Sequence, residues 1–143
     1  MALPVKLAKD HAALLASSDA KLAVNKKMAY EFYRIVLRGR RLDQAETYMH
    51  DDYMQHNPNA ETGIKGFKDF FSKLGGPLPI PETLADLVSI QAEGDMVTLS
   101  LLREHDDPAH PGQKYTTTWF DMFRVANGKI AEHWDPATKP VPK

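Results

Sequence analysis

The residues best suited to chemistry lie near the end of the chain, between Tyr115 and Asp135. Alternation along a β-strand places Asp121 on the same face as three aromatic residues. These are Tyr115, Trp119 and Phe123. A carboxylate in such surroundings is either paired with a cation, or kept from water so that its pKa rises and it can hold and return a proton. The first role is structural and the second is catalytic, and the sequence leaves both open.

The partner of Asp121 depends on the turn of the last hairpin. A two-residue Asn127-Gly128 turn would place Trp134 opposite Asp121. A three-residue loop that begins at Ala126 would place His133 there instead. We predict the three-residue loop, because it collects the polar groups of both strands on one face. That face would carry Asp121, His133 and Asp135.

Other polar side chains are candidates for contacting a ligand. His56 stands before an Asn-Pro turn, where it either caps the turn or projects over the sheet and donates to a ligand oxygen. Tyr115 is a second candidate for that donor. Arg103 continues the apolar face of residues 97–101. It is either a counter-charge for Asp121 or a strand-end cation that reaches water.

The loop at residues 104–113 contains four possible metal ligands, which are His105, Asp106, Asp107 and His110. Their spacing matches no rigid metal motif, and prolines make the loop irregular, so a solvated loop is the better interpretation. The chain has no cysteine, which excludes thiolate metal sites and cysteine nucleophiles. A phosphate-binding glycine loop and a serine nucleophile elbow are absent from the sequence. We therefore expect neither a metal nor a cofactor.

The elements that must position these residues change type midway along the chain. In the first half, a cap at residues 17–19 precedes a helix with an apolar stripe from Met28 to Val36. This helix should end at Gly39 in the left-handed conformation. A shorter helix with Met49 on its apolar side follows, and residues 64–74 carry the clearest helical stripe. Residues 1–18 are expected to be an N-terminal extension or a short helix.

The second half alternates with a period of two, which is typical of strands. The expected strands cover residues 84–90, 97–101, 115–125 and 129–134. Helices followed by an antiparallel meander predict an α+β fold, in which a curved antiparallel sheet packs against the N-terminal helices. A length of 143 residues fits one domain.

Composition excludes several classes of function. The chain carries 18 basic and 19 acidic residues, so the electrostatic footprint of a protein that binds nucleic acid or anionic membranes is missing. No run of about 18 apolar residues predicts a transmembrane helix. The first ten residues lack the apolar region of a signal peptide. We expect a cytoplasmic protein that binds neither nucleic acid nor membranes.

Three blocks of the sequence resemble the SnoaL-like proteins, which are relatives of polyketide cyclases within the nuclear-transport-factor-2-like superfamily. The blocks are YMQHNP at 53–58, GIKGFKDFF at 63–71, and FDMFRV at 120–125 with GKIAEHWD at 128–135. The resemblance covers residues 20–136 of a single domain at 1–143. It implies a cystatin-like cone with an apolar pocket at its open end, and a homodimer through the convex face of the sheet.

The resemblance also implies roles for individual residues. In the cyclases, an intramolecular aldol condensation proceeds without metal or cofactor and uses a pocket Asp as acid and base. Asp121 stands at the similar position here. The other residues that match motif positions are His56, Asn57, His133 and Asp135.

Together these observations predict a small-molecule enzyme with acid/base chemistry next to a carbonyl, of the aldol cyclase or isomerase type. Asp121 would be the base and His133 its orienter or relay. His56 or Tyr115 would donate to the enolate oxygen. The other predicted pocket residues are Asn57, Phe67, Arg103, Trp119, Phe123 and Asp135. The predicted ligand is a small apolar molecule with a carbonyl group, and the alternative is a non-catalytic module that binds a ligand or dimerises.

The expected dimer rests on the outer face of the last hairpin. In the three-residue register, this face presents Phe120, Met122, Ile130 and Trp134 to solvent. That is more apolar surface than a monomer usually leaves uncovered, so we expect a second copy to cover it symmetrically.

Overall fold

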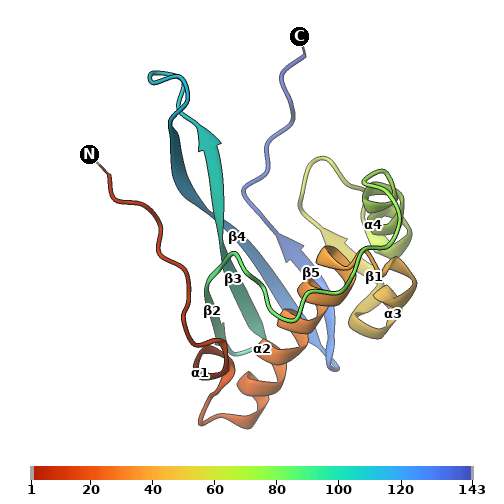
Figure 1. Ribbon diagram of the computed structural model, residues 1–143. Coiled ribbons are helices and arrows are strands. Elements are labelled where there is room, and N and C mark those ends of the chain that lie inside the picture. Colours follow the sequence, from red (N-terminus) through yellow and green to blue (C-terminus); the bar gives the residue numbers. More distant parts are fainter. Residues whose placement is uncertain (1, 143) are drawn as a thin grey trace.

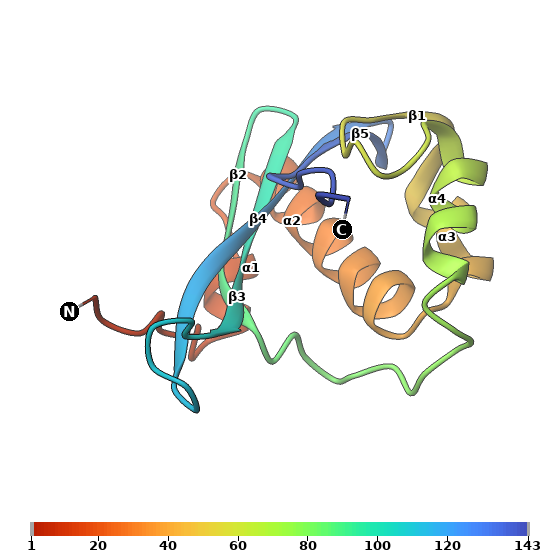
Figure 2. The ribbon, with the colours of Figure 1, turned by 90° about the horizontal axis from the view of Figure 1, so that it is seen from above.

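The computed structural model describes residues 2–142, in which five strands form one sheet that curves around a long helix (Figure 1, Figure 2). The strands lie in the order β1-β5-β4-β3-β2. Their bounds are β1 Met49–Gln55, β2 Leu87–Glu93, β3 Met96–Asp106, β4 Lys114–Ala126 and β5 Lys129–Trp134. The predicted α+β class is confirmed.

Helices cover the concave side of this sheet. The long helix α2 (Ala20–Phe32) packs on β2 and β3, and α4 (Gly63–Ser72) packs on β1 (Figure 2). The other helical segments are α1 His11–Leu15, η1 Tyr33–Arg38, η2 Leu42–Gln44 and α3 Ala45–Tyr48. Among residues 2–142, no helix is both long enough and apolar enough to cross a membrane.

The two ends of the first long helix differ in how well the sequence predicts them. Asp19 caps α2, because its carboxylate accepts from the backbone N–H groups of Lys21 at 2.8 Å and Leu22 at 3.2 Å. The π-helix η1 then continues α2. The expectation of a left-handed Gly39 is wrong, since its φ is −79° and Arg40 takes the positive φ of 51°. Gly39 is needed for close packing instead, because a Cβ there would lie 2.6 Å from the carbonyl oxygen of Ile35.

The strand β1 is missing from the prediction, which placed Met49 in a helix. Met49 and Tyr53 are buried and four residues apart, a spacing that indicates a helix, while the residues between them are polar. In the structure, β1 pairs in parallel with β5, and Gln55 lies beside His133. The sheet is therefore mixed, and not antiparallel throughout as expected.

The hairpin β4–β5 has a register that combines parts of both predicted alternatives. Its turn has two residues, Asn127 and Gly128, with φ of 49° and 75°, so the three-residue loop is wrong. The register then shifts at Ala131, an extra residue in β5 that forms a β-bulge. Beyond this bulge, His133 pairs with Phe123 and not with Asp121. The bulge lets His133 face inward, where the prediction placed it.

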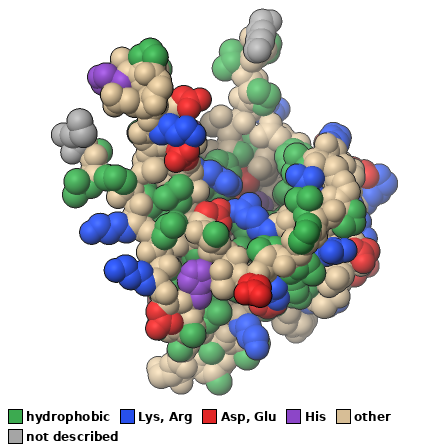
Figure 3. Space-filling view, viewed as in Figure 1, with side chains coloured by type: hydrophobic (Ala, Val, Ile, Leu, Met, Phe, Trp, Pro, Cys, Tyr) green, Lys and Arg blue, Asp and Glu red, His purple; other side chains and the backbone are tan. Residues whose placement is uncertain are grey.

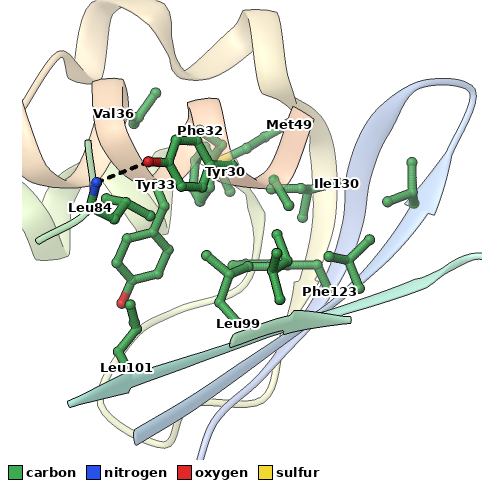
Figure 4. Packing of buried hydrophobic residues seen from close by; sticks show 14 of the residues in the cluster. Tyr30, Phe32, Tyr33, Val36, Met49, Leu84, Leu99, Leu101, Phe123 and Ile130 are labelled. Carbon is green, nitrogen blue, oxygen red and sulfur yellow. Dashed lines mark hydrogen bonds between the residues drawn. The ribbon is translucent and has the colours of Figure 1, made fainter. Parts of the chain in front are cut away.

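The core lies between α2–η1 and the concave face of the sheet (Figure 4). Buried side chains of the strands meet those of the helices there, and the phenol of Tyr30 accepts from the backbone N–H of Leu84 at 3.1 Å (Figure 4). Ile130 is fully buried in this core, so the expectation that it faces outward is wrong. The labelled members in Figure 4 include Phe32, Tyr33, Val36, Met49, Leu99, Leu101 and Phe123.

Candidate functional site

A cavity of about 460 Å³ opens between the sheet, η1 and α4. Its walls are mostly aromatic and aliphatic, and its polar groups come from η1, β1, β3, β4 and β5 and from the residues that follow η1, β1 and β5. The space-filling view shows Lys and Arg side chains around a hollow on this side of the molecule (Figure 3). The apolar lining residues include Phe32, Leu37, Phe67, Phe70, Phe71, Leu74, Trp119 and Phe123.

Asp121 is a buried carboxylate in this wall, and three side chains hold it. Its Oδ1 lies 2.7 Å from Nε2 of His133. Its Oδ2 accepts from the hydroxyl of Tyr33 at 2.8 Å and from the indole N–H of Trp119 at 3.1 Å. Within residues 2–142, His133 is the only basic side chain that pairs with Asp121. The carboxylate is thus satisfied largely by neutral donors.

The other ring nitrogen of His133 has a partner whose orientation is determined by the backbone. Nδ1 lies 2.7 Å from Oε1 of Gln55. The backbone N–H of Asn57 donates to the same oxygen at 3.0 Å, and the amide nitrogen of Gln55 donates to the Tyr53 hydroxyl at 2.8 Å. Because a backbone N–H can only donate, the amide oxygen must face Asn57, and Nδ1 of His133 must therefore carry a proton.

This assignment determines how many protons the Asp121–His133 pair holds. If Nδ1 is protonated, the 2.7 Å contact between Nε2 and Oδ1 needs a second proton, because otherwise two lone pairs would face each other. That proton belongs either to the imidazole, which makes an ion pair, or to the carboxyl, which makes a neutral pair. The pair, named here the Asp–His dyad, therefore shares one proton across this contact.

Two buried tyrosines around the dyad stay protonated over the ordinary pH range. Burial, followed by the charge of Asp121, raises the pKa of Tyr33 well above its usual value. Burial likewise raises the pKa of Tyr53 to about 12. Tyr33 is therefore a neutral hydroxyl donor to Asp121.

Asp135 lies beside the dyad but is bound to other groups. Its Oδ2 accepts from the side-chain amide of Asn57 at 2.7 Å, and its Oδ1 accepts from the backbone N–H of Ala137 at 2.9 Å. Asp121, His133 and Asp135 bring possible ligand atoms within 4.8 Å of one another. However, Nε2 of His133 and Oδ1 of Asp121 are hydrogen-bonded to each other, so the arrangement suits proton transfer better than coordination.

Comparison with protein families identifies the chain. The model of the SnoaL-like domain matches residues 29–133. The chain belongs to the SnoaL-like domain family. No curated protein sequence matches it significantly.

Solved structures support the same fold for this SnoaL-like chain. A candidate polyketide cyclase of Acidithiobacillus ferrooxidans is 18% identical, with a TM-score of 0.57 over 84% of this chain and 89% of the other. A protein of unknown function with a cystatin-like fold from Xanthomonas campestris is 16% identical, with a TM-score of 0.55 over 78% and 88%. An LEH-like epoxide hydrolase of Mycobacterium tuberculosis is 14% identical, with a TM-score of 0.53 over 78% and 80%. At these identities the likeness concerns the fold.

Most of the predicted pocket residues of the SnoaL-like chain do line the cavity. They are Asn57, Phe67, Arg103, Trp119, Asp121, Phe123, His133 and Asp135. Arg103 does not pair with Asp121, because its guanidinium carbon lies over the ring of Trp119, 5.4 Å from the centroid.

Two predicted donors lie elsewhere, so their predicted placement is wrong. His56 binds Glu132 at 2.7 Å and stacks on Trp134 on the convex side of the sheet. The hairpin β3–β4 extends past the cavity and carries Tyr115 with it. Tyr115 is 45% exposed and stacks on His105. His105 and His110 of the solvated loop hydrogen-bond to Thr117 and Asp107.

Sequence reasoning missed the residues that hold the dyad in place. Tyr53 and Gln55 are two residues apart in β1 and both line the cavity, so reading residues 49–55 as a strand would have found them. Tyr33 carries no such signal, because it lies beside the predicted apolar stripe of its helix. The π-helix η1, which begins at Tyr33, is where this hydroxyl meets Asp121.

Proposed function

We propose that this SnoaL-like protein is a small-molecule enzyme that moves protons next to a carbonyl group, as in an aldol cyclase or isomerase. The observation that carries the proposal is the 2.7 Å contact between His133 and Asp121 in the wall of a largely apolar cavity. A cavity of about 460 Å³ falls within the usual range for small-molecule sites. Because the largely apolar walls exclude water, water competes less with the ligand for the proton of the dyad than it would at the protein surface.

The dyad can supply both a base and an acid to one substrate. In its ion-pair form, the carboxylate of Asp121 takes a proton from the carbon next to the carbonyl, and Nε2 of His133 gives its proton to the carbonyl oxygen. The C–H bond breaks, an O–H bond forms, and the substrate becomes an enol. The dyad is left with a protonated Asp121 and a neutral His133. Transfer of that proton across the 2.7 Å contact restores the starting state.

The test uses a simple ketone, 4-methylacetophenone, in D₂O. Exchange of its acetyl protons for deuterium, followed by proton NMR, reports enol formation directly. We expect the wild-type protein to accelerate the exchange, and Asp121→Asn to slow it by about two to four orders of magnitude. The control is Glu132→Gln on the convex face, which should exchange at the wild-type rate. No acceleration by the wild-type protein, or equal rates for Asp121→Asn and wild type, would contradict the proposal.

A non-catalytic ligand-binding module is the alternative function. The three hydrogen bonds to Asp121 favour it, because a carboxylate so well satisfied can be purely structural. In that case ketones would bind in the cavity without exchange of their acetyl protons. The same NMR experiment therefore separates the two functions.

We also propose a homodimer through the convex face of the sheet. Phe120 and Met54 are 49% and 44% exposed there, and Trp134 pairs with Met122 beside them. A second copy would cover this apolar surface. Light scattering should give twice the mass of 16.1 kDa, and Trp134→Glu should shift the protein toward monomer or aggregate. A wild-type monomer at micromolar concentration would contradict the dimer.

A further inference from the structure

Two arginines face the cavity from opposite walls. Arg103 lies on β3 in the sheet, and Arg40 lies between η1 and η2 on the helical side. Both are half-buried. Neither forms an ion pair with a carboxylate of residues 2–142, whereas the neighbouring Arg38 binds Asp86 and stacks on Tyr33. Two arginines of the cavity wall are thus not paired with a carboxylate of the described residues, and burying a charge partly without a partner is unfavourable.

Arg103 is positioned where an anion could meet it. Its guanidinium carbon lies over the ring of Trp119, 5.4 Å from the centroid, and the same indole donates its N–H to Asp121. A cation over an aromatic face is attracted to the ring while its N–H groups can still bind a carboxylate. Trp119 therefore contacts both Arg103 and Asp121.

The backbone of Arg40 adds a second observation. Arg40 has a φ of 51°, which is unfavourable for a residue with a side chain, and no glycine stands there. The glycine lies one residue earlier, where packing against Ile35 and Ile80 requires it. An unfavourable backbone conformation that presents a side chain to a cavity is often part of a binding site.

The pairing of β3 with β4 gives the distance between the dyad and this cationic end. Leu99 pairs with Asp121, Leu101 with Trp119, and Arg103 with Thr117. Side chains two residues apart on one strand are separated by about 7 Å, so Arg103 branches from the sheet about 14 Å beyond the level of Asp121. Because the guanidinium folds back over Trp119, a bound anion would lie roughly 7 to 14 Å from the dyad.

We propose that Arg103, with Arg40 facing it, forms an anion-binding subsite for a carboxylate of the ligand. Given the proposed function, the substrate is a carbonyl compound that bears a carboxylate about 7 to 14 Å from the carbonyl. The carboxylate oxygens accept hydrogen bonds from the guanidinium N–H groups of Arg103. The apolar body of the ligand lies against Phe70, Phe71 and Leu74, which line the same cavity.

The experiment compares an acid with its neutral ester. The probes are 3-(4-acetylphenyl)propanoate and its methyl ester, and calorimetry measures the dissociation constant of each. We expect the wild-type protein to bind the acid at least about tenfold more tightly than the ester. Arg103→Gln should weaken binding of the acid by about 10- to 100-fold and change ester binding less than about twofold. Arg103→Lys should bind the acid with an affinity between those of the wild-type protein and Arg103→Gln. Lysine keeps the positive charge but lacks the planar guanidinium that binds a carboxylate through two hydrogen bonds.

A matched control and a local readout complete the design. Arg124→Gln removes the same charge from the convex face, where Arg124 binds Glu132, and should leave both dissociation constants unchanged. In a Trp134→Phe background, Trp119 is the one remaining tryptophan, so its fluorescence should change with the acid more than with the ester. Equal affinity for acid and ester, wild-type affinity in Arg103→Gln, or no binding of the acid at about 10 mM would overturn the subsite.

Failure of the subsite and failure of the proposed function give different results. If the acid binds through Arg103 but its acetyl protons do not exchange with D₂O, the subsite stands and the acid/base function is wrong. If ester and acid both exchange but bind equally, the function stands and the subsite is wrong.

Discussion

Two histidine–carboxylate pairs lie on opposite faces of the sheet at β5. His133 and Asp121 face the cavity, while His56 and Glu132 face the convex side. The contact between Nε2 and the carboxylate oxygen is 2.7 Å in both pairs. Exposure differs, since the His133 side chain is 12% exposed and that of His56 is 46% exposed.

The further partners of each carboxylate make the larger difference. Glu132 also binds Arg124 at 2.8 Å, and this hydrogen bond, followed by the one from His56, lowers its pKa. The charge of Glu132 is therefore fixed by a permanent cation. Asp121 has only neutral donors apart from His133, and Gln55 holds the far nitrogen of that histidine. The comparison teaches that two pairs with the same contact distance can differ in what surrounds the carboxylate, which is a permanent cation for Glu132 and two neutral donors for Asp121.

Replacing each carboxylate by leucine compares the two pairs by stability. Asp121→Leu leaves the buried donors Tyr33 and Trp119 without an acceptor and should lower the free energy of unfolding by about 2 to 4 kcal/mol. Glu132→Leu breaks partly exposed pairs and should lower the free energy of unfolding clearly less than Asp121→Leu does. Urea denaturation measures both, and equal losses would remove the distinction between the two faces.

Asp121→Asn should differ sharply from Asp121→Leu. The amide oxygen can accept from Tyr33 and Trp119, and the amide nitrogen can donate to Nε2 of His133. Every hydrogen bond keeps a partner, so stability should change by less than about 1 kcal/mol while the exchange rate falls. A marked loss of stability in Asp121→Asn would favour a structural ion pair.

Gln55→Met tests whether the amide of Gln55 holds the tautomer of His133. Without that acceptor, Nδ1 need not carry the proton, and we expect exchange to slow by about tenfold with a changed pH–rate profile. Gln55→Glu retains an acceptor at this position and should restore much of the wild-type profile. An unchanged profile in Gln55→Met would remove Gln55 from the positioning residues.

Tyr53→Phe should have the smallest effect, and its clearest sign should appear at high pH. Burial raises the pKa of Tyr53 to about 12 in the folded protein, above the value of about 10 in the unfolded chain. The stability linked to this group is therefore complete below about pH 10 and is lost as pH rises toward 12. Absorbance of tyrosinate should show one late-titrating group fewer in Tyr53→Phe, and an identical titration curve would contradict the assignment.

Local signals in the sequence predicted some features of the site well. The cap at Asp19, the stripe that contains Phe67 and the inward face of β4 all follow from side-chain spacing. The placement of His133 depended on a bulge at Ala131, a residue with no turn or bulge signature. The placement of Gln55 depended on parallel pairing with β5, which is a long-range contact that spacing does not report.

The parallel pairing of β1 with β5 has a consequence for the order in which the protein folds. Strands β2 to β5 are joined by short connections, whereas the Gln55–His133 contact closes a loop of 78 residues. The entropy cost of closing such a loop delays contacts of this kind until others support them. We therefore expect the meander to form first, with Asp121 and His133 already neighbours. His133 acquires its fixed tautomer only when β1 pairs with β5. We therefore expect the hydrogen-bonded chain from Gln55 through His133 to Asp121 to be completed in the last step of folding.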